Sequence, residues 1–162
     1  SLRETYHFPG MRVLQFEFGK MSPAEDLPEN LVVCTGTHDN DTLLGWFESL
    51  PVKSSDEDML TQNKLLKFFQ CTKENIHWEI IGYALSTASY TVTIPLQDIL
   101  GENSSARFNT PGTLSPDNWS WRMEEGKLTH SLKTKLAELT KRHNRNTSAV
   151  INLLKKEIES WK

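Results

Sequence analysis

The sequence predicts an α/β fold with parallel strands. Three short runs rich in apolar or β-branched residues, at residues 11–18, 31–35 and 90–94, have the length and composition of strands. Segments with helical spacing lie between the second run and the third, and again after the third. Strands that alternate with helices form βα units with parallel neighbouring strands, so we expect one parallel sheet with helices beside it.

The first predicted strand, residues 11–18, follows a Pro-Gly turn. Side chains alternate along a strand, which would put Gln15 and Glu17 on one face and Phe16 on the other. Both faces of a parallel sheet are usually covered, so polar residues near the carboxyl end of such a strand are expected to point into a site.

Caps, breakers and apolar spacing predict the helices. Pro51 would end a short helix that starts near Thr42. The hydroxyls and carboxylates of residues 54–58 are typical of the first turn of the next helix. The helices are expected at residues 42–50, 54–69, 74–89, 96–100, 127–143 and 150–161.

Composition excludes some classes of partner. The net charge of the 162 residues is −3, which favours neither nucleic acid nor a membrane surface. Residues from 127 onward carry nine Lys or Arg against three Asp or Glu, which is typical of a solvated helix face. No apolar run approaches the roughly 20 residues that cross a bilayer, and no signal peptide is apparent. Two cysteines, Cys34 and Cys71, suit reduced thiols, so we expect a cytoplasmic protein.

A dense polar stretch, residues 35–42, follows the second predicted strand. It places His38, Asp39 and Asp41 within four positions, directly after an apolar run. Polar clusters at the carboxyl end of a strand that leads into a helix are where α/β enzymes place their catalytic groups. Burying such groups without a partner costs free energy, which indicates a specific role.

Helix capping is the alternative explanation for this stretch. Asp41 or Thr42 would be a good N-cap for the next helix, and Asn40 suits a turn. Capping does not account for His38 and Asp39. The pattern alone therefore leaves a cap and a catalytic site both open.

A metal site or an organic cofactor is not expected. Three ligands as close in sequence as His38, Asp39 and Asp41 rarely converge on one ion without further ligands, and no Cys or second His joins them. No Gly-rich turn follows any predicted strand, so phosphate-loop and dinucleotide fingerprints are missing.

Five motifs carry a family resemblance. Residues 35–42, with Gly45 and Trp46 after them, resemble the seventh-strand motif of 4-alpha-glucanotransferases, the amylomaltases and disproportionating enzymes. The other motifs resemble the family's sixth strand, eighth strand and closing loop; they lie at residues 9–18, 95–101, 107–113 and 118–122. Five motifs in the same order are far more specific than one short match.

The resemblance implies a barrel fold that this chain is too short to complete by itself. An eight-stranded barrel typically needs about 250 residues. These strands would be numbers six to eight of a (β/α)8 TIM barrel of glycoside hydrolase type. Residues 1–143 would then be the C-terminal part of the catalytic barrel, and residues 144–162 a C-terminal helical extension.

The resemblance also implies an activity. Members transfer α-1,4-glucan segments between malto-oligosaccharides with retention, using a carboxylate nucleophile and a carboxylic acid/base. In the family these two groups lie on the fourth and fifth strands, which would precede Ser1, so neither Glu17 nor Asp98 is assigned to them. We expect the missing N-terminal part of the same enzyme to be a partner, the fragment alone to be inactive, and no cofactor to be needed.

Individual residues inherit expected roles from the resemblance. Asp39 matches a carboxylate that stabilises the transition state by accepting hydrogen bonds from the glucose at the cleavage point, and His38 matches a donor to the same sugar. Phe16 matches an aromatic platform for an acceptor-side sugar. Asn109 matches a closing-loop residue that contacts the glucan, and Asn40 is a weaker candidate for substrate binding.

Other positions are expected to be structural or depart from the family. Arg107 is expected to form an ion pair or to clamp carbonyl groups, and Trp119 and Trp121 to pack the closing loop. The family often has an acidic pair after the sixth strand, where this chain has Gly19 and Lys20. The acceptor-side contacts are therefore expected to differ.

Two other functions remain open from the sequence. A non-catalytic remnant would bind glucan without chemistry. An α-amylase-like hydrolase would also carry a His-Asp pair at a strand end, such as His38 and Asp39. Product analysis separates transfer from hydrolysis, because only transfer yields longer glucans.

Overall fold

The computed structural model describes residues 2–19 and 27–145. It divides into two compact units, with the boundary between Lys127 and Leu128. The first unit holds the sheet and the polar stretch, and the second holds one described helix. Each unit is described by itself below.

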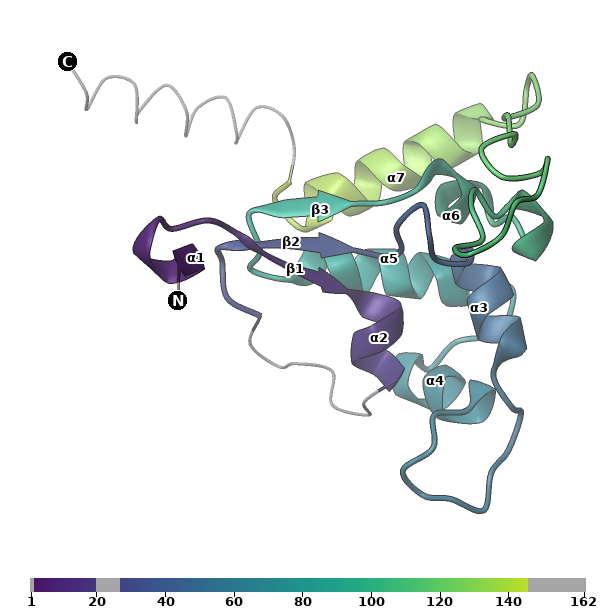
Figure 1. Ribbon diagram of the computed structural model, residues 1–162, viewed down its shortest axis with the longest axis horizontal. Coiled ribbons are helices and arrows are strands. Elements are labelled where there is room, and N and C mark those ends of the chain that lie inside the picture. Colours follow the sequence, from purple (N-terminus) through teal and green to yellow (C-terminus); the bar gives the residue numbers. More distant parts are fainter. Residues whose placement is uncertain (1, 20–26, 146–162) are drawn as a thin grey trace. The chain divides into compact units, whose positions relative to one another are not determined.

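The first unit is built on a parallel sheet of three strands, β1 (Gly10–Val13), β2 (Leu31–Cys34) and β3 (Thr91–Thr93), in that order. Their arrows point the same way in Figure 1. Cys34 pairs with Val13 on one side and Thr93 on the other, so the three carboxyl ends meet at one edge. The predicted parallel α/β arrangement is confirmed.

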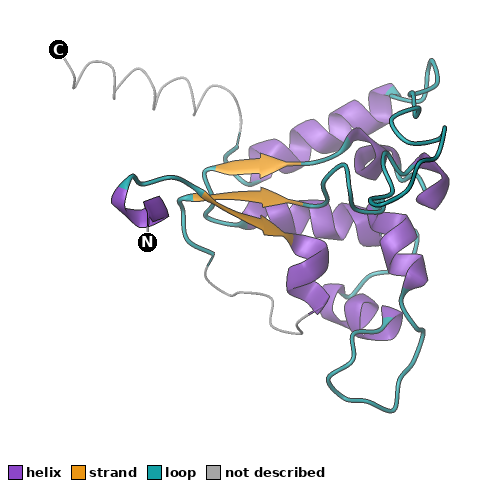
Figure 2. Cartoon of the chain, viewed as in Figure 1, coloured by secondary structure: helices purple, strands orange, loops and turns teal. Residues whose placement is uncertain are grey.

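One short helix precedes β1 and others follow each strand of this unit, as Figure 2 shows in purple. They are α1 (Leu2–Thr5), α2 (Leu14–Gly19), α3 (Leu43–Ser49), α4 (Gln62–Phe69), α5 (Ile76–Ser86), α6 (Leu96–Leu100) and the 3-10 turn η1 (Ser104–Ala106). The helix α5 packs against α3, α4 and α6. The core is formed by β2, α3 and α5, because Val33, Leu43, Phe47, Ile76 and Ile80 are almost fully buried.

The first predicted strand is wrong beyond Val13, because the chain turns into α2 at Leu14. Leu14 is 1% exposed and Phe18, four positions on, is 3% exposed, whereas Phe16 is 60% exposed. This is helical rather than alternating burial. The Phe18 ring lies 5.4 Å from the ring of Tyr83 in α5, a long-range contact that the local pattern could not reveal.

The helix predicted from residue 54 begins only at Gln62. The Thr61 hydroxyl caps it by accepting from the Lys64 N–H at 3.2 Å. The expected capping groups instead stabilise turns, because Ser54 Oγ accepts from the Asp56 N–H at 3.0 Å. Hydroxyls and carboxylates suit turns as well as caps, which is why the pattern misplaced this start.

The remaining helix predictions in the first unit are confirmed at α3, α5 and α6. In the second unit the helix predicted at residues 127–143 is confirmed as α7 (His130–Arg142), capped by the Thr129 hydroxyl. The helix predicted at residues 150–161 lies outside the described residues. None of the helices in residues 2–19 and 27–145 is long and apolar enough to cross a membrane.

Candidate active site

The polar stretch forms the loop between β2 and α3, at the carboxyl edge of the sheet. Thr42 caps α3, because its hydroxyl accepts from the Gly45 N–H at 3.0 Å. Asp41 braces the loop, with its carboxylate accepting from the Thr42 N–H at 2.8 Å and from the Ser104 hydroxyl at 2.7 Å. Capping and bracing thus account for Thr42 and Asp41, and leave His38 and Asp39 for another role.

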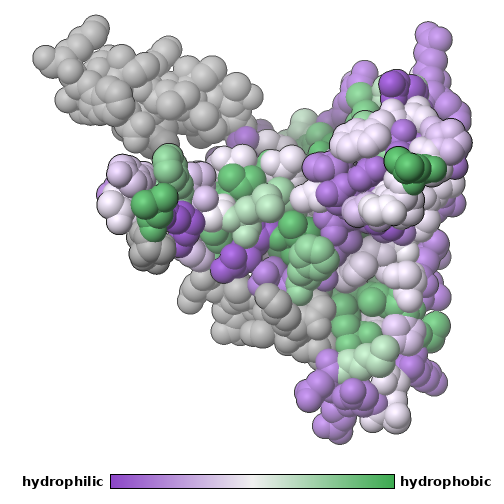
Figure 3. All heavy atoms as spheres, viewed as in Figure 1, coloured by the Kyte–Doolittle hydropathy of each residue, from purple (hydrophilic) through white to green (hydrophobic). Residues whose placement is uncertain are grey.

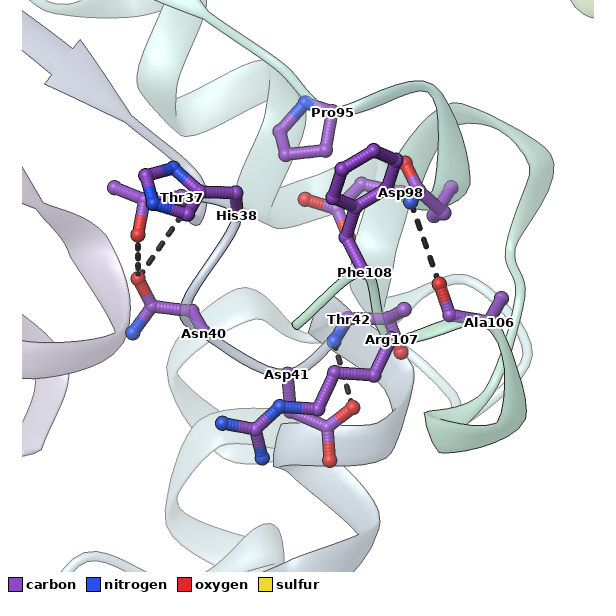
Figure 4. A pocket seen from close by; sticks show the side chains of 11 residues that line it. Thr37, His38, Asn40, Asp41, Thr42, Pro95, Asp98, Ala106, Arg107 and Phe108 are labelled. Carbon is purple, nitrogen blue, oxygen red and sulfur yellow. Dashed lines mark hydrogen bonds between the residues drawn. The ribbon is translucent and has the colours of Figure 1, made fainter. Parts of the chain in front are cut away.

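Asn40 shapes the loop from within. Its Oδ1 accepts from the Thr37 N–H at 3.0 Å and from the Thr37 hydroxyl at 2.7 Å, as drawn in Figure 4. The Thr37 hydroxyl oxygen in turn accepts from the Asp39 N–H at 3.4 Å. These bonds make a compact turn that sets the direction of the two residues between Thr37 and Asn40.

The side chains of His38 and Asp39 come together with Asn109 from the segment after η1. His38 Nε2 lies 3.3 Å from Asp39 Oδ2, and Asn109 Nδ2 donates to Asp39 Oδ1 at 2.6 Å. The Asp39 side chain is 46% exposed. Three of the predicted site residues therefore meet, and the Asp39 carboxylate between the other two stays open to a ligand.

Arg107 joins the two segments through their backbones. Its Nη2 donates to the Asp39 carbonyl at 2.7 Å, and its Nε donates to the Asn109 carbonyl at 2.9 Å. The guanidinium group presents several N–H donors in one plane, which suits two acceptors at once. Of the two expected roles, the geometry gives Arg107 that of a carbonyl clamp.

Trp119 packs the closing segment against this cluster. The centroid of its ring lies 5.2 Å from that of His38 and 5.1 Å from that of Phe108. The backbone N–H of Trp119 donates to the Phe108 carbonyl at 2.7 Å. Its φ of +64° is uncommon for a bulky residue, so these contacts must hold an unfavourable backbone. Trp119 as a whole residue is still 53% exposed.

Phe16 and Asn40 stand apart from the Asp39 cluster in different ways. Phe16 lies on α2 instead of at a strand end, but its neighbour Gln15 donates to the Asp41 carbonyl at 2.9 Å, so α2 contacts the loop. Asn40 contributes its oxygen to the internal turn of the loop. The structure thus brings His38, Asp39 and Asn109 together, with Phe16 on an adjoining helix.

Asp98 is a residue whose position the sequence did not reveal. It lies in α6 and is 1% exposed, and its Oδ2 accepts from the Thr35 hydroxyl at 2.7 Å while its Oδ1 accepts from the Leu43 N–H at 2.8 Å. Burial raises the pKa of the Asp98 carboxyl from 3.8 to about 6, although both hydrogen bonds oppose this rise. The available signal was an aspartate in the first turn of a short helix that follows a strand.

A pocket of about 220 Å³ lies between the β2–α3 loop and the segment after β3 (Figure 4). His38, Asp41 and Thr42 line it on one side, and Asp98 and Phe108 on the other. Asp39 and Asn109 do not line it, so their exposed groups lie outside. Its volume is below the range of about 300–1,000 Å³ typical of ligand pockets, so this pocket alone does not hold an oligosaccharide.

The carboxylates of the site are not grouped as metal ligands are. Among the residues that the structure describes, no group of three or more His, Cys, Asp or Glu side chains is placed to hold a metal ion. The Asp39 carboxylate accepts from the Asn109 side-chain amide and lies 3.3 Å from His38 Nε2. The cluster therefore offers hydrogen-bonding groups of a kind that recognise hydroxyls.

Comparison with known proteins decides the family. A family model described as 4-alpha-glucanotransferase, of the glycoside hydrolase 77 group, matches residues 1–129. This chain belongs to the 4-alpha-glucanotransferase family. The resemblance inferred from five motifs is confirmed by a match over most of the chain.

Curated relatives of the family agree with this assignment. The chain is 44% identical over 143 residues to the rice chloroplastic/amyloplastic 4-alpha-glucanotransferase DPE1, covering 86% of this chain and 23% of the rice protein. It is 40% identical over 151 residues to a 4-alpha-glucanotransferase of Synechocystis, covering 90% of this chain and 28% of that protein. The chain thus spans about a quarter of the length of these relatives.

A solved structure of the family shares the fold. Amylomaltase from Streptococcus agalactiae, in complex with acarbose, matches with a TM-score of 0.77 and 29% identity. The match covers 90% of this chain and 29% of the amylomaltase chain. The α/β fold with the parallel sheet described above therefore matches a portion of this amylomaltase.

Proposed function

We propose that this chain is part of a 4-alpha-glucanotransferase that transfers α-1,4-glucan segments between malto-oligosaccharides with retention. In this proposal β1, β2 and β3 are strands six to eight of a (β/α)8 barrel. Residues 1–143 belong to the catalytic barrel, and residues 144–162 form an extension. The nucleophile and the acid/base come from strands outside this sequence, so the 162 residues alone are inactive.

The observation that carries the proposal is the Asp39 carboxylate, held between His38 and Asn109 at the carboxyl edge of a parallel sheet. Active sites of (β/α)8 enzymes lie at this edge. Asp39 Oδ1 and Oδ2 each face a nitrogen, yet the side chain is half exposed. It can accept hydrogen bonds from sugar hydroxyls without being reoriented.

The chemistry then follows from charge and geometry. The glucose at the cleavage point becomes oxocarbenium-like as its bond breaks, and hydrogen bonds to its ring hydroxyls strengthen at that stage. A fixed carboxylate at Asp39 stabilises the transition state more than the ground state. His38 and Asn109 both orient Asp39 and offer polar groups to the same sugar, and Phe16 and Asn40 contact the bound glucan at the margin of the site.

The sheet edges are consistent with further strands. Among the described residues, β1 and β3 each pair on one side only. Apolar side chains are exposed around β1, as the green area over α1 and β1 in Figure 3 shows; they include Leu2, Phe8 and Met11. An unpaired strand beside exposed apolar residues is a surface that further strands of a barrel would cover.

The proposed compartment is the cytoplasm or another reducing environment. Cys34 and Cys71 are both free, and burial raises the pKa of each thiol, which keeps them protonated and unreactive. The rice and Arabidopsis relatives are named as chloroplastic/amyloplastic.

The decisive experiment replaces Asp39 in the full-length enzyme that contains this sequence. Asp39→Asn should lower kcat for maltotriose disproportionation by at least about 100-fold while the thermal midpoint stays close to wild type. Asp56→Asn is the matched control, because Asp56 is an exposed aspartate in the α3–α4 connection whose carboxylate also accepts an N–H hydrogen bond, here from the Asp58 backbone.

Products and turnover decide between functions. Wild-type enzyme should convert maltotriose into glucose and longer glucans. Shorter sugars alone would show a hydrolase, and binding without products would show a remnant. Wild-type turnover in the Asp39→Asn variant would defeat the proposed role of the carboxylate.

A further inference from the structure

The Asp98 carboxylate joins the two ends of the loop that carries His38 and Asp39. Thr35, which directly follows β2, donates its hydroxyl to Oδ2 at 2.7 Å. Leu43, the first residue of α3, donates its N–H to Oδ1 at 2.8 Å. One side chain in α6 therefore fixes the points where the loop leaves the strand and enters the helix.

These two hydrogen bonds are shielded from water. Asp98 is 1% exposed, and both of its donors are buried. By contrast, the bond from Gln15 to the Asp41 carbonyl is partly buried, and the bond from Arg107 to the Asp39 carbonyl is exposed. Bonds that water cannot replace constrain a loop more than exposed ones, since breaking them leaves unsatisfied groups.

The rest of the loop depends on its two ends. Between them, the turn of Thr37 and Asn40 sets the direction of Asp39, which must meet Asn109 from another segment at 2.6 Å. A shift of either end moves the carboxylate relative to Asn109. Displacements of about 1 Å can lower turnover by about 100-fold even when they arise away from the reacting groups.

We propose that Asp98 is a positioning residue for glucan transfer, which holds the Asp39 carboxylate at its catalytic position by fixing both ends of the β2–α3 loop. This inference rests on the proposed function. In this role Asp98 acts through Thr35 and Leu43, because it is 1% exposed and its two oxygens accept from these residues. A side chain with two polar atoms is required, because the Thr35 hydroxyl and the Leu43 N–H belong to different segments.

Two variants of the full-length enzyme separate geometry from charge. Asp98→Asn keeps one oxygen for the Leu43 N–H and turns an NH₂ group toward the Thr35 hydroxyl, whose oxygen can accept. It should keep kcat within about threefold of wild type. Asp98→Ala loses both bonds and should lower kcat by about 30- to 100-fold, with a smaller change in KM.

Gln62→Ala is the matched control. Gln62 is also a buried polar side chain, and it donates to the Leu50 carbonyl at 2.8 Å, away from the β2–α3 loop. Its loss should lower the thermal midpoint without changing kcat. If Asp98→Ala keeps kcat within threefold of wild type, or if Gln62→Ala loses kcat equally, the positioning role is overturned.

Two further measurements keep the test decisive. If Asp98→Ala does not fold, Thr35→Val removes one of the two bonds at nearly constant volume and should lower kcat about 3- to 10-fold; an unchanged kcat would overturn the proposal. Amide hydrogen exchange gives a readout apart from activity, because Thr35→Val or Asp98→Ala should speed exchange at Asn40 and Leu43 while Gln62→Ala should not.

Turnover and hydrogen exchange together separate the proposed function from the proposed role of Asp98. Wild-type turnover in Asp39→Asn would defeat the proposed function whatever Asp98 does. An inactive Asp39→Asn together with a fully active, folded Asp98→Ala would defeat only the positioning role. Unchanged exchange at Asn40 and Leu43 in Asp98→Ala would overturn the structural basis of that role.

Discussion

The side-chain amide of Asn109 donates a 2.6 Å hydrogen bond to the carboxylate of Asp39, 70 positions earlier in the chain. This bond joins the β2–α3 loop to the segment that follows η1. A short bond to a charged acceptor is stronger than one between neutral groups. The orientation of Asp39 is therefore set by a segment far from it in sequence.

Replacing Asn109 tests this relationship. Asn109→Ala removes the donor and should lower kcat for disproportionation by about 10-fold. Asn109→Asp should be worse at neutral pH, because two carboxylates at this distance repel and one of them takes up a proton. The pH profiles of both variants are the measurement, with partial recovery at acid pH expected only for Asn109→Asp. Equal profiles would contradict a direct contact.

Replacing Arg107 by lysine tests the carbonyl clamp. A single ammonium group cannot reproduce the paired bonds to the carbonyls of Asp39 and Asn109, so Arg107→Lys should lower kcat about 10-fold despite keeping the charge. Arg122→Lys is the control, since Arg122 also donates to two carbonyls, those of Trp119 and Trp121. If Arg107→Lys keeps the kcat of wild type and only Arg107 variants that remove the charge lose activity, the clamp is contradicted.

The raised pKa of Asp98 predicts how stability depends on pH. Because burial raises its pKa from 3.8 to about 6, the folded protein binds the proton more tightly than the unfolded chain. Its contribution to the free energy of unfolding is fully present below pH 3.8 and is lost as the pH rises through 6. The increase in pKa corresponds to a contribution to the unfolding free energy of about 3 kcal/mol at most.

Asp98→Asn removes this titration. Urea unfolding of the full-length enzyme between pH 4 and 7 should show a flatter pH dependence in the variant than in wild type, as read from the midpoint and slope. The difference should lie between pH 4 and pH 6. Identical curves for the two proteins would contradict a buried, titrating Asp98.

Replacing Gly45 by alanine is expected to destabilise the protein, although Gly45 lies within a helix. Gly-to-Ala changes within helices commonly stabilise them. A Cβ at Gly45, however, would lie 2.6 Å from Asp41 Oδ1 and too close to Ser104 Oγ, within the pair that braces the loop. Gly45→Ala should therefore cost about 1–3 kcal/mol in unfolding free energy.

A double variant checks the cause of that cost. Ser104→Ala removes the hydroxyl that the new Cβ would meet, so Gly45→Ala combined with Ser104→Ala should lose less stability than the sum of the single variants. Thermal midpoints of the four proteins suffice. Strict additivity would show that the Asp41–Ser104 pair is not what the methyl group disturbs.

The sequence by itself determined the βα order, the parallel sheet and most of the helices. These follow from local spacing. The apolar run of β2 and the periodicity of α5 and α7 can each be recognised within a short stretch of sequence. The polar stretch after β2 was visible in the same way, and with it His38 and Asp39 as candidates. Local chemistry also predicted that Asp41 or Thr42 caps α3, and the structure shows that Thr42 does.

Only the tertiary structure decided the direction of residues 14–19 and the start of α4. The apolar side chains at 14, 16 and 18 suit a strand, but the chain turns into a helix that buries Leu14 and Phe18. The Phe18 ring finds its partners in α3, α4 and α5. The meeting of Asn109 with Asp39 and the span of Asp98 across the loop were equally hidden. Such contacts depend on which segments the fold brings together, and no local periodicity records that.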